Sequence, residues 1–137
     1  MTNPFELTAT DAIKLIGNNK LSRYEWVQSC FERIREKEGL VKAWIYLDED
    51  RALEKAKQLD NENDKSQLGI PFGIKDIIDA SNTPTGFGTN FYQNNVPMRD
   101  AASVSVAKQS GCIFIGKTVS TEPVSYTHLR AHETSGY

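Results

Sequence analysis

The stretch that decides the fold of this chain runs from Gly69 to Asp79 and reads Gly-Ile-Pro-Phe-Gly-Ile-Lys-Asp-Ile-Ile-Asp. Its β-branched and aromatic residues, bounded by glycine and proline, indicate a strand that ends near Lys75. Because the lysine lies among isoleucines and a phenylalanine, we expect its amine to be poorly solvated, which favours the neutral form that acts as a base. A lysine near a strand end also commonly extends to water, and the spacing alone allows both environments.

The residues after this strand predict a βαβ unit. We expect a loop rich in Gly, Thr and Asn over residues 81–95, a helix over 100–110 and a strand over 112–115. Gly111 lies where a helix favours glycine just beyond its end. A strand, a crossover helix and a second strand imply a parallel pair with a right-handed connection. Functional groups in such sheets gather beyond the carboxyl ends of the strands, where Lys75 would lie.

The first half of the chain predicts helices around one further strand. Ser22 and Glu25 form a capping box, and the apolar residues after them recur at helical spacing. The predicted elements of this part are a helix over residues 9–16, a longer helix over 22–39, a strand over 43–47, a helix from 48 onward and a polar surface loop over 60–67. The fold class is therefore α/β, with N-terminal helices followed by a βαβ unit.

Composition indicates one ordinary globular domain. The chain has 137 residues, of which 39% are hydrophobic and 25% charged, and its net charge is −2 with both signs mixed along the sequence. We therefore expect no nucleic acid and no membrane as partner, and a cytoplasmic location. Cys30 and Cys112 are far apart and lack metal-ligand spacing, so we expect neither a disulfide nor a metal site.

Two motifs match the patterns of a phosphate site and a metal site, but the residues around them do not support either function. Residues Gly111–Thr118 match the phosphate-binding pattern GxxxxGK[ST], but the four residues between the glycines form the predicted strand rather than a loop. We therefore expect Lys117 and Thr118 to form the exit loop of that strand. His128 and His132 have the spacing of two metal ligands on one helix face, but no third ligand accompanies them.

Several motifs in the same order resemble those of the amidase signature family of C–N hydrolases. They are Leu68–Asp79, Thr83–Thr85, Arg99–Ala101 and Ser110–Glu122. The resemblance extends over about residues 5–122, and it implies a truncated part of the mixed-sheet α/β fold of that family.

The resemblance also implies a mechanism. Members of the family use a Ser-cisSer-Lys triad without metal or cofactor, and Lys75 is the position that matches its lysine. The two serines and the oxyanion hole of the family come from a Gly- and Ser-rich segment that would follow residue 122. Ser120, Ser125 and Ser135 lack the glycines of that segment, so we assign none of them as nucleophile. The substrate implied for the full-length parent is a small-molecule amide.

The end of the chain departs from the family pattern. Residues 123–137 look like translated sequencing-adaptor read-through of the kind found at the ends of metagenomic gene fragments. We therefore expect residues 1–122 to be the N-terminal part of an amidase-signature domain, residues 123–137 to be a non-native or disordered tail, and the chain itself to be inactive. Two alternatives stay open: part of the amidase subunit of a tRNA-dependent amidotransferase, and a small α/β binding module without enzymatic activity.

Overall fold

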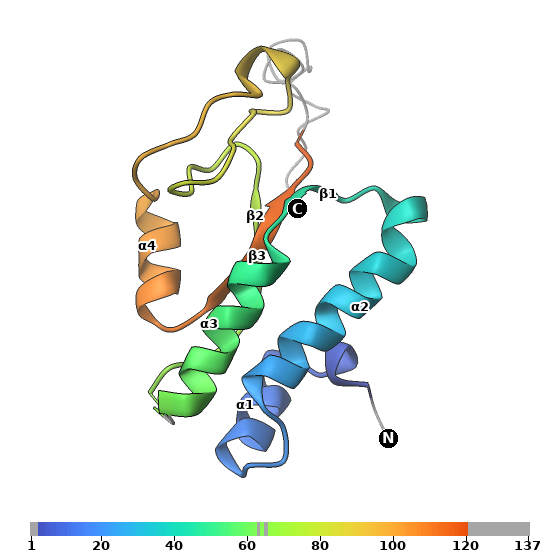
Figure 1. The fold of residues 1–137 in the computed structure, drawn as a ribbon, viewed down its shortest axis with the longest axis vertical. Helices are drawn as coiled ribbons and strands as arrows, with labels where there is room; N and C mark the ends of the chain where they lie inside the picture. The colour runs from blue at the N-terminus through green and yellow to red at the C-terminus, as the bar shows by residue number, and fades with distance from the viewer. Residues whose placement is uncertain (1–2, 63, 65, 121–137) are drawn as a thin grey trace, which may run out of the picture.

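The computed structural model describes residues 3–62, 64 and 66–120. Its elements, in chain order, are η1 (Pro4–Glu6), α1 (Ala9–Gly17), α2 (Arg23–Val41), β1 (Trp44–Leu47), α3 (Glu49–Glu62), β2 (Pro71–Lys75), η2 (Asn90–Tyr92), α4 (Ala102–Gln109) and β3 (Ile113–Thr118). Helices α2 and α3 lie on one side of the strands and α4 on the other (Figure 1). The chain is thus a three-layer α/β arrangement, which confirms the predicted fold class.

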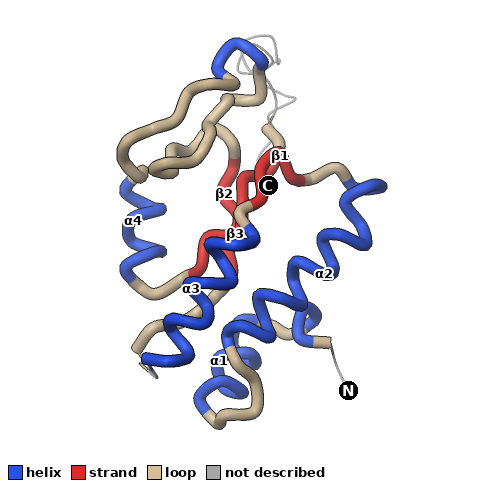
Figure 2. The backbone as a smooth tube through the Cα atoms, viewed as in Figure 1, coloured by secondary structure: helices blue, strands red, loops and turns tan. Residues whose placement is uncertain are grey.

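The sheet is mixed. Strand β3 lies in the centre, paired in parallel with β2 and antiparallel with β1, so the strand order is β1-β3-β2 (Figure 2). The parallel pair confirms the βαβ unit that the sequence predicted. The antiparallel pairing of β1 with β3 did not follow from the sequence, because β1 is short and its partner lies about seventy residues later.

Each face of the sheet has its own apolar core. On one face, α2 and α3 pack against β3 through the buried residues Val27, Phe31, Ala52, Ala56, Leu59, Ile113 and Ile115. On the other face, α4 packs against β2 through Ile74, Ala80 and Val104. The periodic apolar stripes of α2 and α3 thus form core, as their spacing indicated.

The helix ends that the sequence marked are confirmed. The Ser22 hydroxyl accepts from the Glu25 backbone N–H at 3.0 Å, and the Glu25 carboxylate accepts from the Ser22 N–H at 2.8 Å. Gly111 follows α4 with a φ of +78°, the left-handed conformation that favours glycine after a helix.

Two predicted boundaries were wrong. Helix α3 extends to Glu62, into the run predicted as a loop. Its Asp60 is held there because the carboxylate accepts from the backbone N–H groups of Arg23 and Tyr24 at 2.9 and 3.0 Å. Strand β3 extends to Thr118, so Lys117 and Thr118 belong to the strand and form no exit loop. Pairing with strands on both sides stabilises this longer strand.

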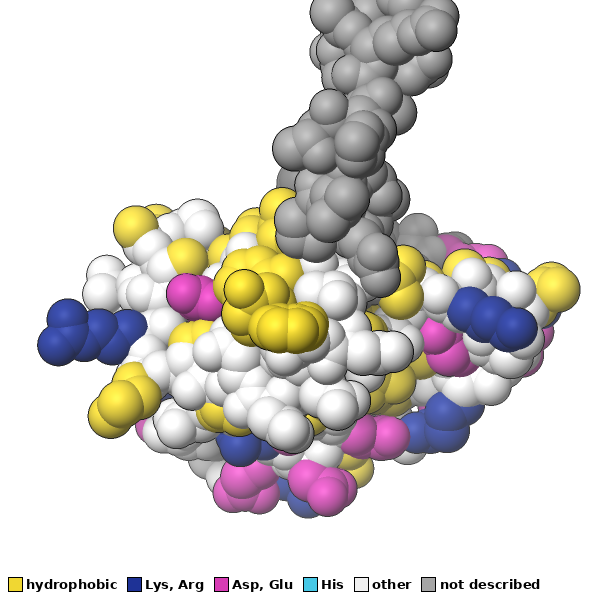
Figure 3. Space-filling model, turned by 90° about the horizontal axis from the view of Figure 1, so that it is seen from above, with side chains coloured by type: hydrophobic (Ala, Val, Ile, Leu, Met, Phe, Trp, Pro, Cys, Tyr) yellow, Lys and Arg dark blue, Asp and Glu magenta, His cyan; other side chains and the backbone are white. Residues whose placement is uncertain are grey.

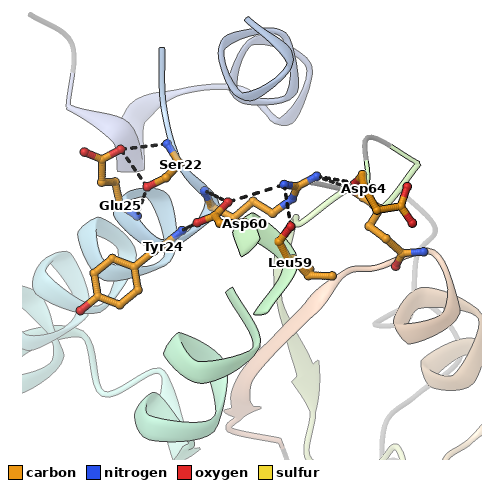
Figure 4. Close-up of polar contacts among 8 residues, drawn as sticks. Ser22, Tyr24, Glu25, Leu59, Asp60 and Asp64 are labelled. Atoms are coloured by element: carbon orange, nitrogen blue, oxygen red, sulfur yellow. Dashed lines mark hydrogen bonds and ion pairs between the residues drawn. The ribbon is translucent and has the colours of Figure 1, made fainter. Parts of the chain in front are cut away.

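Arg23 joins the two long helices to the segment that leads into β2. Figure 4 shows two of its partners, Asp60 and Asp64. The side chain of Arg23 is only 6% exposed and lies 3.5 Å from the Asp60 carboxylate. Its guanidinium also donates to the backbone carbonyls of Asp64 and Gln67, at 2.9 and 2.7 Å. These bonds fix the segment that leads into β2, and with it the strand that ends at Lys75.

Candidate active site

The carboxyl ends of the parallel strands meet at one edge of the sheet. Lys75 ends β2 and lies in register with Thr118, which ends β3. The long loop over residues 81–98 lies beyond this edge, at the upper end of the molecule in Figure 1. In parallel sheets this is the edge at which functional groups collect.

Lys75 is exposed, so of the two environments that the sequence allowed for its amine the structure shows the solvated one. Successive side chains of a strand point to opposite faces, and in β2 the buried position belongs to Ile74, which packs under α4. The backbone of Lys75 is nevertheless held firmly. Its carbonyl accepts from the Ile78 N–H at 2.9 Å, and the next N–H, that of Asp76, donates to the Thr118 carbonyl at 3.0 Å.

The buried lysine of this region is Lys117, whose side chain is fully shielded from water. Its Nζ donates to the Ile78 carbonyl at 2.6 Å and to the Thr85 hydroxyl at 2.8 Å. Burial lowers the pKa of the Lys117 amine, while the nearby carboxylates of Asp76 and Asp79 oppose this shift. The sequence predicted Lys117 in a loop, and the contacts that bury it lie 39 and 32 residues upstream.

A bulge in β3 explains why Lys117 and Lys75 differ. Phe72 pairs with Phe114, but Gly73 pairs with Gly116, so Ile115 is an extra residue in β3. The extra residue shifts the register by one, which places Lys117 opposite the buried Ile74 instead of opposite Lys75. Because such a shift exchanges the faces of all following side chains, the bulge turns Lys117 into the interior.

Asp76 organises the loop that follows β2. This residue is 1% exposed, and its two carboxylate oxygens accept from the backbone N–H groups of Gly86 and Gly88, each at 3.0 Å. Sequence reasoning missed this contact. The available signal was an aspartate directly after a strand together with two glycines spaced by one residue, which suits a carboxylate that binds successive backbone amides.

A cavity of about 300 Å³ opens beside this contact. Its polar lining residues include Asp76, Thr89 and Asn90, and its apolar lining residues include Ile45 and Val119. Gly86 and Gly88 also line it, and we call the loop over residues 81–98 that contains them the glycine loop. Ser120 also lines the cavity, whereas Ser125 and Ser135 lie outside the described residues. A second cavity, of about 450 Å³, is lined by residues of α1, the start of α2 and Leu68. These elements lie at the lower end of the molecule in Figure 1, away from the carboxyl ends of β2 and β3.

Metal and membrane sites are not evident in the part of the chain that the structure describes. Within residues 3–62, 64 and 66–120, no three His, Cys, Asp or Glu side chains are grouped to hold a metal ion. His128 and His132 lie outside these residues, as does the tail predicted from residue 123. No described helix has the length and apolar character needed to cross a membrane. Residues Gly111–Thr118 form a turn and a strand, not the loop and following helix that a phosphate site requires.

Curated relatives match most of this chain. It is 33% identical over 113 residues to the A subunit of glutamyl-tRNA(Gln) amidotransferase from Endomicrobium trichonymphae. The matched residues are 79% of this chain and 23% of that relative. The protein of the same name from Oceanobacillus iheyensis is 32% identical over 136 residues. This match covers 97% of this chain and 27% of that relative. The chain thus spans about a quarter of the length of these relatives.

A solved structure and a family model agree with them. The peptide amidase of Stenotrophomonas maltophilia superposes with a TM-score of 0.76 at 27% identity, over 85% of this chain and 26% of that one. The amidase family model matches residues 25–128, a segment that contains β2, β3 and both lysines of the site. The chain therefore belongs to the amidase family.

Proposed function

We propose that this chain supplies the lysine side of the active site of a serine amidohydrolase, with Lys75 as the catalytic base. The observation that carries the proposal is the position of Lys75 at the carboxyl end of β2, directly before the Asp76 that lines the cavity, in a chain of the amidase family. A base must lie within hydrogen-bond reach of the proton that it takes, and an exposed amine at this edge is accessible to serines of another segment.

The proposed reaction is acyl transfer. Neutral Lys75 takes a proton from a bridging serine, which takes the proton of a second serine as this attacks the amide carbonyl. The C–N bond breaks, the amine leaves with a proton, and an acyl-enzyme ester remains. Water then attacks the ester, returns the serine and releases the carboxylic acid. In the exposed environment seen here, packing of the serine segment against Lys75 would supply the desolvation that favours the neutral amine.

The test is made in the full-length parent, whose gene can be recovered by sequencing outward from the codons for residues 75–122. Lys75→Ala is expected to lower kcat/KM for carboxamide hydrolysis by about a hundredfold or more. The matched control is Lys14→Ala, because Lys14 is an exposed lysine on α1, far from the strand ends. Release of ammonia or amine from a panel of carboxamides measures both. Equal activity of the Lys75 variant and the parent would remove the proposed base.

The second candidate is the amidase subunit of a tRNA-dependent amidotransferase. The curated relatives favour it, because those at 30–34% identity are named as A subunits of glutamyl-tRNA(Gln) amidotransferase. Such a protein would require partner subunits and charged tRNA, contrary to the expectation that no nucleic acid is a partner. Purification of the tagged parent from its host distinguishes the two: co-purifying subunits with tRNA-dependent glutamine hydrolysis support the amidotransferase, and activity of the isolated chain on simple amides supports the stand-alone hydrolase.

A further inference from the structure

We infer that Lys117 is a positioning residue, whose buried amine fixes the turn that carries Lys75 against the start of the glycine loop. The inference rests on the proposed function only in naming Lys75 as the base. The amine has two acceptors, and each belongs to a different segment. The Ile78 carbonyl belongs to the turn after β2, and the Thr85 hydroxyl belongs to the beginning of the loop.

The first contact reaches Lys75 through one backbone group. Ile78 accepts from Lys117 through its carbonyl and donates its own N–H to the carbonyl of Lys75. The turn over residues 75–78 is therefore held at one end by Lys117 and at the other by the bond from Asp76 to Thr118. Because the backbone is fixed on both sides, the Cα of Lys75 has a defined position. A base needs such a defined position relative to its proton donor.

The second contact reaches the cavity. Thr85 is fully buried and directly precedes Gly86, one of the two amides that the Asp76 carboxylate binds. Lys117 and Asp76 thus hold the same loop from two sides, one through a side-chain hydroxyl and the other through backbone N–H groups. We call this set of five residues, Asp76, Ile78, Thr85, Gly86 and Lys117, the loop clamp. The charges are complementary, because the carboxylates of Asp76 and Asp79 favour the charged form of Lys117.

The cost of burial supports a specific role. A lysine whose side chain is wholly removed from water is expensive unless its donors are used, and a hydrophobic residue would fill the same space without that cost. The hydrogen bonds of Lys117 go to groups that shape the site edge, and the apolar cores on either face do not include it.

The test is amide hydrogen exchange of this chain, followed by NMR, with the exposed Phe91 and Met98 replaced by serine in every sample to limit self-association. Thr85→Val removes the hydroxyl acceptor at nearly constant shape, whereas Thr85→Ser retains the oxygen. Lys117→Met removes the amine, and Lys14→Met is the control at an exposed lysine. In Thr85→Val and Lys117→Met we expect the amides of Ile78 and Gly86 to exchange about tenfold faster or more, beyond any change at core amides.

The core reference amides are those of Ala56 in α3 and Ile113 in β3, which are buried on the opposite face of the sheet from α4. Thr85→Ser and Lys14→Met should leave all of these rates as in the unsubstituted chain. A second readout is the titration of the Lys117 amine followed at its Nζ: Thr85→Val should lower the Lys117 pKa and Thr85→Ser should not, because the hydroxyl accepts from the charged form.

Three results would overturn the inference. They are equal acceleration at site and core amides, unchanged rates in both Thr85→Val and Lys117→Met, and an absence of protection at Ile78 and Gly86 in the unsubstituted chain. None of these readouts involves catalysis. If Lys75→Ala in the full-length parent kept its activity, the proposed base would be wrong but the loop clamp would not be affected. If the hydrogen-exchange results contradicted the clamp, the base role would still be decided by the activity of Lys75→Ala.

Discussion

At the scale of single residues, two lysines close in space have opposite surroundings. Lys75 is exposed at the end of β2, and Lys117 is fully buried one register position away. The difference arises from one extra residue in β3, Ile115, which turns Lys117 toward Ile78 and Thr85 of the loop clamp. The buried amine of Lys117, with its two hydrogen bonds, contributes to the free energy of unfolding differently from an exposed amine. The pH dependence of the free energy of unfolding measures this difference.

We predict that the Lys117 amine makes the stability of this chain rise with pH on the alkaline side. The pKa of Lys117 is lowered on folding, so between that value and the ordinary lysine value of 10.5 the unfolded chain binds more protons than the folded one. The free energy of unfolding therefore increases as pH rises through this window, and the gain is lost as pH falls through the folded pKa. Urea unfolding of the unsubstituted chain and of Lys117→Met at several pH values measures it.

The difference between the two chains isolates Lys117, because the tyrosines and the other lysines titrate in both. As pH rises, we expect the free energy of unfolding of the unsubstituted chain to increase relative to that of Lys117→Met. A difference that stays constant over the window, or that changes in favour of Lys117→Met, would contradict the lowered pKa.

At the scale of elements, the start of β2 depends on Arg23. The glycine that precedes the strand, Gly69, has a φ of +68°, and an added Cβ would lie 2.5 Å from the Cδ of Arg23. Gly69 therefore allows the buried guanidinium to pass next to the backbone while it binds the carbonyls of the segment between α3 and β2.

We predict that Gly69→Ala lowers the free energy of unfolding by about 1–3 kcal/mol, because it adds backbone strain and displaces Arg23. Gly39→Ala is the control: Gly39 lies in α2 with nothing within 4 Å of an added Cβ. That substitution should be neutral or stabilise by about 0.5–1 kcal/mol, because alanine favours the helix. Denaturant unfolding of both variants checks the pair. An unaffected Gly69→Ala chain would mean that Arg23 does not anchor β2.

At the scale of the whole molecule, much apolar surface faces water. Both β1 and β2 have one neighbour in the described sheet, which leaves a free edge on each. Exposed hydrophobic side chains gather over the loops beyond the strand ends (Figure 3). Among them, Phe91 is 88% and Met98 92% exposed. Such a surface favours association with other chains.

We predict that the chain self-associates at micromolar concentration, and that replacing both Phe91 and Met98 with serine reduces this association. Because both side chains are exposed, the replacement should change the stability of the fold by no more than about 0.5 kcal/mol. Leu40→Ser is the control, since Leu40 is 85% exposed but lies on α2. Sedimentation velocity measures the association. A chain that sediments as a monomer at these concentrations would contradict the prediction.

The sequence by itself determined the local elements and the pairing of β2 with β3. The Ser22–Glu25 capping box, the apolar stripes of the helices and the glycine after α4 act within a few residues, so their effect can be read along the chain. The order strand, helix, strand then requires a parallel pair, and the β-branched and aromatic residues before Lys75 indicated that this lysine ends the first strand.

Only the tertiary structure decided which side chains of the site are buried. Strand β1 joins β3 from far earlier in the chain, and Lys117 takes partners 39 and 32 residues upstream. A single bulge sets the face on which Lys117 lies, and neither propensity nor periodicity records a bulge. Burial is a property of the assembled layers, so a lysine that looked like part of a loop became the most buried charged group at the strand ends.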